Sequence, residues 1–361
     1  MPCFDPVPYL GDELALPYCD PAVLRRLRTT PLKLRGPRFV AQRSEFLQFC
    51  KVLDKSDRVD LHPVRSIPPW RLSQFLALWK SQSLDRTLQD RRDPNEEEET
   101  PEADSRDMPT GERLCDFHLT GDEVLILSKS DADDCYPSYV ATPERAVTNA
   151  VGTPVRVREV RDGPGALDPD EWVYVCVRGL PQGDHGAVHY CLDSHRHFLR
   201  AEASVLTAES EIRATAPFPR DARSPDALVL DDYIRYIIVS LRALVSGSAS
   251  RPDRDALERV LSAYDRCSKA GNGLRAAPDK LEVDLLDGTA VGAESLGLLG
   301  HMGAPRMRRL EAMLLTVRLL RGGASTRKII QVLAGIWISI FLFRRPLMNI
   351  LADIFEVLGG R

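Results

Sequence analysis

The chain has 361 residues, of which 43% are hydrophobic, and it carries a formal net charge of -4 at pH 7. This length and composition predict a folded protein of roughly two or three packed units. The acidic total argues against a protein whose whole surface coats nucleic acid. The charge is uneven, however, because residues 306–345 contain nine Lys and Arg against one acidic residue, Glu311.

The first part of the chain is expected to hold few regular elements. Residues 1–65 are rich in Pro and Arg and are expected to form an irregular extension. Residues 68–80 carry apolar side chains at helical spacing, which predicts a helix. The acidic, Pro-containing segment 93–110 is expected to be a mobile surface loop. Residues 124–127 then form a short apolar strand that leads into a cluster of aspartates.

The rest of the chain is expected to alternate strands and helices without the regular rhythm of a doubly wound sheet. Residues 172–177 are typical of a buried strand, followed by a glycine turn and a helix over about 185–199. Residues 227–239 have apolar, β-branched and aromatic side chains on both sides of two aspartates, which suits a hairpin. Helices are predicted over 253–270, 306–320 and 325–341. This order favours an α+β fold.

The eight cysteines form no Cys-x-x-Cys pair. The pattern therefore predicts neither a zinc site nor a redox centre, and it favours a reducing compartment, the cytoplasm or the nucleus. The start of the chain lacks the features of a secretory signal. The apolar run 329–343 is shorter than the roughly 20 residues that span a bilayer, so a buried helix and no membrane contact are predicted.

Three aspartates are the candidates for chemistry. Asp131 follows the strand at 124–127, and Asp231 and Asp232 lie at the bend of the predicted hairpin. If these two elements are neighbours in one sheet, the three carboxylates converge and can hold the divalent cations that phosphoryl transfer requires. Each aspartate alone fits ordinary turn chemistry as well. The hypothesis therefore depends on the segments around them.

Those segments follow one another in a defined order. They are Leu88–Asn95 (LQDRRDPN), Asp131–Ser138 (DADDCYPS), Leu180–Gly183 (LPQG), Val229–Asp232 (VLDD), Gly273–Lys280 (GLRAAPDK) and Gly292–Leu296 (GAESL). In this order they resemble the motifs of retroviral and retrotransposon reverse transcriptases. Residues 325–330 resemble the start of the second thumb helix of that family, and the resemblance covers about residues 80–343.

The resemblance implies a right-hand polymerase fold, which is α+β, with an antiparallel palm sheet flanked by helices and a helical thumb. After an irregular N-terminal extension over 1–65, it implies a fingers-like region with an acidic loop over 66–120. A palm with the catalytic motifs would occupy 121–304, and a helical thumb-like region would occupy 305–361.

The resemblance also implies roles for single residues. Asp131, Asp231 and Asp232 would be catalytic and would hold two Mg²⁺ ions, with Mn²⁺ as an alternative, and Lys280 would be a catalytic proton donor near the leaving pyrophosphate. The ring of Tyr136 would exclude a 2′-hydroxyl. Substrate binding is expected at Lys80, Arg86, Arg92, Tyr136, Gln182 and Gly183. Nucleic-acid binding is expected at Arg306, Arg308, Arg309 and Arg321.

The implied activity is that of an RNA-directed DNA polymerase, a nucleotidyltransferase that uses deoxynucleoside triphosphates and an RNA or DNA template-primer. The sequence departs from the family pattern in three places: Val229 replaces an aromatic residue, Asp133 adds a negative charge and Pro137 stiffens a turn. No four-carboxylate nuclease domain follows the thumb, so we expect a fragment or a reduced gene product.

Two other functions stay open. The first is a catalytically inactive, retroelement-derived protein that binds nucleic acid or a protein partner. The second is a polymerase that copies RNA into RNA, against which the ring of Tyr136 argues.

Each candidate residue also fits an ordinary structural role. Gln182 and Gly183 fit a turn before a helix, and Tyr136 fits a core position. Surface ion pairs or solvated faces account equally for the basic candidates, namely Lys80, Arg86, Arg92, Lys280 and the arginine cluster. The four clustered histidines, His185, His189, His195 and His197, lack a recognisable zinc-ligand pattern and are expected to be solvated on a helix surface.

Overall fold

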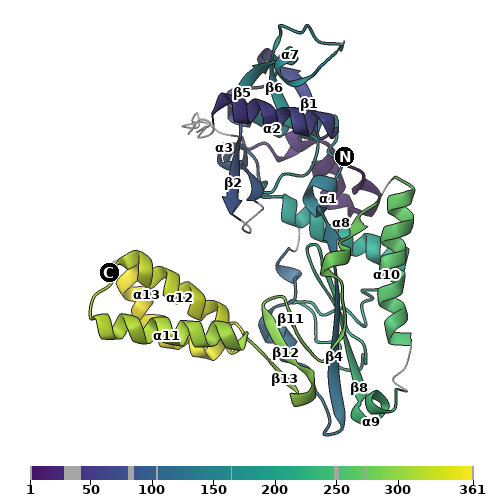
Figure 1. The fold of residues 1–361 in the computed structure, drawn as a ribbon, viewed down its shortest axis with the longest axis vertical. Helices are drawn as coiled ribbons and strands as arrows, with labels where there is room; N and C mark the ends of the chain where they lie inside the picture. Colours follow the sequence, from purple (N-terminus) through teal and green to yellow (C-terminus); the bar gives the residue numbers. More distant parts are fainter. Residues whose placement is uncertain are drawn as a thin grey trace. The chain divides into compact units, whose positions relative to one another are not determined.

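The computed structural model describes residues 2–27, 42–79, 85–102, 105–163, 165–247, 252–271 and 273–359. The chain folds into two compact units, each built from three separate segments. Unit 1 comprises Met1–Ser105, Ala132–Ala201 and Leu261–Ala276, and unit 2 comprises Arg106–Asp131, Glu202–Val260 and Ala277–Arg361. Figure 1 follows these segments along the chain.

Unit 1 contains two small antiparallel sheets. Three strands have the order β1-β6-β5, and β2 pairs separately with β3. The strands are β1 (Val59–Pro63), β2 (Gln74–Trp79), β3 (Asp85–Asp90), β5 (Ala150–Arg156), β6 (Trp172–Val177) and the short β9 (Arg275–Ala276). The helices are α1 (Asp12–Cys19), α2 (Arg43–Lys55), α3 (Arg92–Glu97), α5 (Cys135–Ser138), α6 (Pro143–Thr148), α7 (Val157–Val160) and α8 (Ala187–Ala203), with the second half of α10 (Pro252–Lys269).

The three-stranded sheet of unit 1 is covered by α2 and α7. One buried cluster joins the helices to the sheet through Phe46, Cys50, Val157, Val160, Val59, Leu61, Val151, Val155, Val173 and Val175. In β6, Val173 and Val175 are two residues apart, so they point to the same face of the sheet. Burial of this apolar face therefore holds the sheet and the helices together.

Unit 2 is organised around an antiparallel sheet with the order β10-β4-β8-β7. Figure 1 shows β4 and β8 side by side. The strands are β4 (Glu123–Asp133), β7 (Asp226–Val229), β8 (Asp232–Ser240) and β10 (Glu282–Leu285), and a smaller sheet holds β11 (Asp287–Ala290), β12 (Ala293–Leu296) and β13 (His301–Gly303). The helices are α4 (Gly111–Leu114), α9 (Leu241–Val245), α11 (Arg306–Gly322), α12 (Arg327–Phe341) and α13 (Ala352–Gly359).

The two central strands, β4 and β8, bury apolar side chains on both faces of the sheet. One face contributes Leu125, Leu127, Ile234, Tyr236 and Ile238 to a large cluster, and the other contributes Val124, Ile126, Ile237 and Val239 to a smaller one. Because both faces are packed, the strands form a rigid base that extends to Asp131 and Asp232.

The predicted α+β class is confirmed, with antiparallel sheets beside helices. The strands predicted at 124–127 and 172–177 are present as parts of β4 and as β6. The hairpin predicted at 227–239 is formed by β7 and β8, and the predicted helices correspond to α8, α10, α11 and α12.

Three local predictions are wrong. Residues 68–80 are not a helix: a short 3-10 turn over Pro69–Arg71 is followed by strand β2, which pairs with β3. The segment 93–110 is not wholly a surface loop, because it contains most of α3 and buries Asp93, Glu97 and Asp107. The described part of residues 1–65 is not irregular, since it forms α1, α2 and β1.

Helix α12 covers most of the apolar run 329–343 but is amphipathic rather than buried throughout. Ala334 and Ile340 are buried, whereas Ile329 and Val332 are exposed. Among the described residues, no helix combines the length and the apolar character needed to cross a membrane.

Candidate active site

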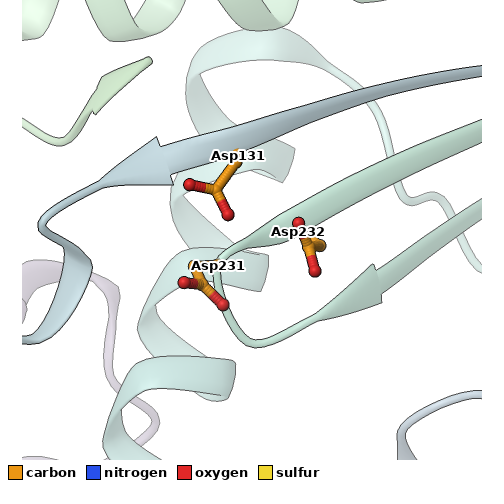
Figure 2. A group of neighbouring side chains, drawn as sticks. All are labelled: Asp131, Asp231 and Asp232. Atoms are coloured by element: carbon orange, nitrogen blue, oxygen red, sulfur yellow. The ribbon is translucent and has the colours of Figure 1, made fainter. Parts of the chain in front are cut away.

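Three carboxylates converge at one end of the central sheet of unit 2. Strand β4 supplies Asp131, and the β7–β8 hairpin supplies Asp231 and Asp232 (Figure 2). Asp131 and Asp232 stand directly opposite each other in the antiparallel register. One ligand oxygen from each of the three side chains lies within 4.8 Å of the others. Among the described residues, this is the only such group of three or more His, Cys, Asp or Glu side chains.

The hairpin holds its two aspartates through a tight bend. Val229 pairs with Asp232, so only Leu230 and Asp231 form the loop. Leu230 has a φ of 57°, a left-handed conformation that is uncommon for a side chain of this kind. Two-residue hairpin loops require such positive φ values. The bend is thus held in a sparsely populated conformation by the pairing of the strands around it.

Asp226 anchors the base of the same hairpin. It is 1% exposed, and its Oδ1 accepts hydrogen bonds from the hydroxyl of Tyr233 at 2.7 Å and from Nη1 of Arg235 at 2.5 Å. Its Oδ2 accepts from the backbone N–H of Leu206 and the hydroxyl of Ser210. A buried charge satisfied by this many donors fixes the strands that carry Asp231 and Asp232.

Lys280 places a positive charge beside the carboxylates. Its Nζ donates to Oδ2 of Asp131, while the backbone N–H of Ala277 donates to the carbonyl oxygen of Asp131 at 2.8 Å. The contact with Asp131 raises the pKa of Lys280 above its ordinary value. Lys280 therefore stays protonated and lies within reach of any group bound at the carboxylates.

The carboxylates repel one another. Burial, followed by the charges of Asp231 and Asp131, raises the pKa of Asp232 to about 7. A divalent cation would relieve this repulsion, because hard cations prefer carboxylate oxygens held on rigid elements. The donor set, with one carboxylate on β4 and two at the bend of the β7–β8 hairpin, fits such an ion.

Three of the predicted motif segments pack against one another within unit 1. The carbonyl oxygen of Tyr136 accepts from the backbone N–H of Leu180 at 3.1 Å, and Gly179 lies against Pro137. The carbonyl oxygen of Gln182 accepts from the backbone N–H of Gln89 at 2.9 Å. The segments 88–95, 135–138 and 180–183 are therefore neighbours in space.

Gly183 cannot carry a side chain at this position. Its φ is +130°, and an added Cβ would lie 1.9 Å from the carbonyl oxygen of Gln89. The carbonyl oxygen of Gly183 accepts a hydrogen bond from Nδ2 of Asn95 at 2.8 Å. Tyr136, in α5, and Gln182 are both half-buried. The close approach of two backbone segments therefore requires a glycine at this position. The substrate roles of Tyr136, Gln182 and Gly183 stay predictions.

The basic residues of unit 1 that were predicted to bind substrate have different environments. Lys80 lies outside the described residues, and Arg86 lies in β3 opposite Leu78. Arg92 is exposed, and its guanidinium pairs with Asp90 at 2.6 Å. Its neighbour Arg91, which sequence reasoning did not single out, is buried and contacts Asn149 and Thr148.

The four arginines predicted to bind nucleic acid all lie on α11 but have different environments. Arg308 and Arg321 are exposed. Arg306 is held by Glu294, with 2.9 Å between Nε and Oε1. Arg309 is half-buried, and its Nε has no hydrogen-bond partner among the described residues. The arginine cluster is therefore not one uniform surface.

The histidines are not the solvated group that was expected. His195 is fully buried on α8, where its Nε2 lies 2.6 Å from the hydroxyl of Tyr264. His197 is half-buried beside Asp193 at 3.6 Å. In the described part of the chain, no histidine belongs to a group that could hold a metal ion. Burial of one face of α8 accounts for the difference.

No protein-family model and no curated protein matches the chain. Solved structures of a foamy viral protease-reverse transcriptase are similar to it. The complex of its dRH form with double-stranded DNA has a TM-score of 0.53 and 13% identity, covering 98% of this chain and 54% of that chain. The complex with an RNA/DNA hybrid has a TM-score of 0.56 and 12% identity, covering 94% of this chain and 36% of that chain.

A further complex of the foamy viral protein with double-stranded DNA has a TM-score of 0.53 and 13% identity, covering 93% of this chain and 58% of that chain. The chain thus spans less than two thirds of the length of these structures. At this level of identity the likeness concerns the fold. The chain has an α+β fold similar to that of reverse transcriptase.

Proposed function

We propose that the protein is a reverse-transcriptase-like nucleotidyltransferase that extends a primer with deoxynucleotides on an RNA or DNA template. The observation that carries the proposal is the convergence of Asp131, from strand β4, with Asp231 and Asp232, from the β7–β8 hairpin. The similar foamy viral structures, which hold double-stranded DNA or an RNA/DNA hybrid, support nucleic acid as the partner.

The three aspartates would hold two Mg²⁺ ions, and Mn²⁺ is an alternative. When bound, these cations supply activation of the 3′-hydroxyl and stabilisation of the leaving pyrophosphate. Lys280, whose Nζ donates a hydrogen bond to Asp131, would be the proton donor to the leaving group. The packed strands β4 and β8 hold Asp131 and Asp232 in place, so little reorganisation of these two side chains would accompany the reaction.

The other predicted residues receive the roles that the family resemblance implies. We assign nucleotide binding to Lys80, Arg86, Arg92, Tyr136, Gln182 and Gly183. We likewise assign a fingers-like role to residues 66–120, a palm role to 121–304 and a thumb-like role to 305–361.

The alternative function is a catalytically inactive protein that binds nucleic acid or a protein partner. Val229 and Pro137, as departures from the motif pattern, favour it. Asp133 favours it less, because its side chain is exposed and does not belong to the group formed by the three aspartates.

Primer extension separates these functions. The purified chain is incubated with a labelled DNA primer on homopolymer RNA or DNA templates, with deoxynucleotides and with or without Mg²⁺. We expect extension on both templates that requires the divalent cation. Binding of the primer-template without extension in Mg²⁺ or Mn²⁺ would establish the inactive alternative.

Exposed arginines of α11 are expected to set the salt dependence of nucleic-acid binding. The double substitution Arg308→Gln, Arg321→Gln should flatten the slope of log affinity against log salt by up to about 0.9 for each lost phosphate contact. Fluorescence anisotropy of a labelled primer-template at several salt concentrations measures this slope. Arg220→Gln, an exposed arginine elsewhere in unit 2, is the control and should leave the slope unchanged. An unaltered slope in the double variant would show that α11 does not contact phosphates.

Tyr136→Ala is expected to relax the choice of sugar. If the ring excludes a 2′-hydroxyl, its removal should raise ribonucleotide incorporation while costing less for deoxynucleotides. Tyr136→Phe, which keeps the ring, should retain the preference for deoxynucleotides. Incorporation of each sugar is measured together with thermal melting. A destabilised Tyr136→Ala protein with unchanged sugar preference would assign Tyr136 to the core instead.

A further inference from the structure

Two cysteine side chains that the proposed reaction does not use meet inside unit 1. Cys135 is the first residue of α5, and Cys191 lies in α8. Both belong to the same segment of unit 1, residues 132–201. Each carries its sulfur as a thiol, and the two Sγ atoms are 3.3 Å apart. The sulfur atoms are therefore in direct contact, although they come from different helices.

The separation of these sulfur atoms is close to that of a covalent bond. In a disulfide the two sulfur atoms are about 2.05 Å apart. Cys135 and Cys191 would therefore have to approach by only about 1.2 Å to form one. A movement of this size is within the range of side-chain rotation about the Cα–Cβ bonds. The geometry thus allows a disulfide between α5 and α8.

Burial alone does not distinguish this pair, because unit 1 contains four buried cysteines. Cys135 is 4% exposed, and Cys50, Cys176 and Cys191 are 0% exposed. Cys50 and Cys176 pack in two apolar clusters, where burial raises the pKa of each thiol to about 12. Buried thiols in apolar surroundings are normally inert. The contact between Cys135 and Cys191 is the feature that makes them candidates for oxidation.

The two thiols of the pair differ in their access to solvent. Cys135 follows the exposed residues Asp133 and Asp134 and precedes the half-buried Tyr136, so it lies just beneath the surface of unit 1. Cys191 is fully buried in α8. A small oxidant therefore meets Cys135 first, and Cys191 is placed to react from the interior.

We propose that Cys135 and Cys191 form a modification site, a dithiol that hydrogen peroxide converts into a disulfide. In the first step the sulfur of Cys135 attacks one peroxide oxygen and the O–O bond breaks. The product is a sulfenic acid, and the departing hydroxide takes the thiol proton to become water.

In the second step the sulfur of Cys191 attacks the sulfenic sulfur of Cys135. The S–S bond forms, the S–O bond breaks, and the hydroxide leaves as a second water with the proton of Cys191. The two thiols together lose two electrons, which the peroxide gains. A thiol reductant reverses the change. The inference does not depend on the proposed polymerase activity.

Thiol mapping after peroxide treatment tests the proposal within one chain. The reduced full chain is treated with hydrogen peroxide, quenched with catalase, unfolded with N-ethylmaleimide and digested for mass spectrometry. We expect a linked pair of peptides that contain Cys135 and Cys191, lighter by two hydrogen atoms than the two separate peptides. Cys50 and Cys176, which are equally buried, should react with the maleimide. Dithiothreitol should separate the linked peptides.

Two results of this experiment would overturn the proposal. In the first, Cys135 and Cys191 react with the maleimide to the same extent as Cys50 and Cys176, while oxidation falls on the partly buried cysteines. In the second, Cys135 is oxidised to a sulfinic acid without a link to Cys191.

Variants and thermal melting locate the disulfide independently. A link between residues 56 positions apart restricts the unfolded chain, so peroxide should raise the melting temperature by at least a few degrees. Cys191→Ala should remove both the link and the shift, and should leave a sulfenic acid at Cys135 that dimedone labels. Cys176→Ala, which removes another buried thiol of unit 1, is the matched control and should retain the link and the shift.

Cys135→Ala gives a second reading if Cys191→Ala does not fold, because it should also remove the link and the shift. Equal shifts of the melting temperature in the unmodified chain and in either folded variant of the pair would refute the assignment.

Discussion

Asp231→Ala is expected to lower the rate of primer extension by on the order of a thousandfold or more. The substitution removes one of the three carboxylates that lie within 4.8 Å of one another, and with it a ligand for the catalytic cations. Affinity for the primer-template should change much less, because the alanine removes no positive charge. Single-turnover extension and anisotropy titrations on the same preparation measure the two quantities.

The matched control is Asp221→Ala, which removes an exposed aspartate from the same unit. It should retain the full extension rate. Asp231→Asn, which keeps the size of the side chain, should be as impaired as Asp231→Ala if charge rather than shape is required. Equal extension rates in the unmodified chain and Asp231→Ala would remove the metal-ligand assignment and favour the inactive alternative.

Asp226→Ala is expected to lower the free energy of unfolding by about 3 to 5 kcal/mol, the usual cost of breaking a buried ion pair. The guanidinium of Arg235, which is 9% exposed, would lose its charged partner, and the hydroxyl of Tyr233 would lose its acceptor. Denaturant unfolding followed by circular dichroism measures the change. Asp221→Ala again serves as the control and should stay within about 0.5 kcal/mol of the unmodified chain.

A double substitution tests the mechanism of this loss. Asp226→Asn, Arg235→Met removes both charges while keeping similar volumes, and it should recover part of the stability lost in Asp226→Ala. If the Asp226→Ala protein were as stable as the unmodified chain, the contacts of Asp226 would not stabilise the hairpin.

Local sequence patterns predicted the elements that carry the aspartates. The formation of these elements depends mainly on the apolar pattern within each segment. The β7–β8 hairpin follows from apolar runs on either side of Asp231 and Asp232, and β6 from an uninterrupted apolar stretch. The sequence of the hairpin also contained a pattern that the prediction did not use. With a two-residue bend at 230–231, Asp226 stands opposite Arg235, an opposite-charge pair across two strands.

The errors arose where residues outside a segment decide its structure. The apolar spacing in 68–80 fits a helix, but pairing with β3 makes residues 74–79 a strand. The acidic run that includes Glu98 looks solvated, yet Glu98 is buried beside Arg91 at 3.4 Å. Arg91 in turn approaches Asp184, which lies far along the chain. No local sequence pattern predicts a contact between two residues so far apart along the chain.

The division of unit 2 into three chain segments also governs the order in which it can fold. During synthesis β4 emerges early, but its neighbours β8 and β10 are made much later, and Lys280 meets Asp131 across 149 residues. Pairings of such high sequence separation close slowly. Until then β4 exposes two apolar faces and two unpaired edges, the features that lead nascent chains to associate. A chain released before Glu282 would leave one edge of β4 without its β10 partner. The carboxylate site is therefore complete only after most of the protein has been made.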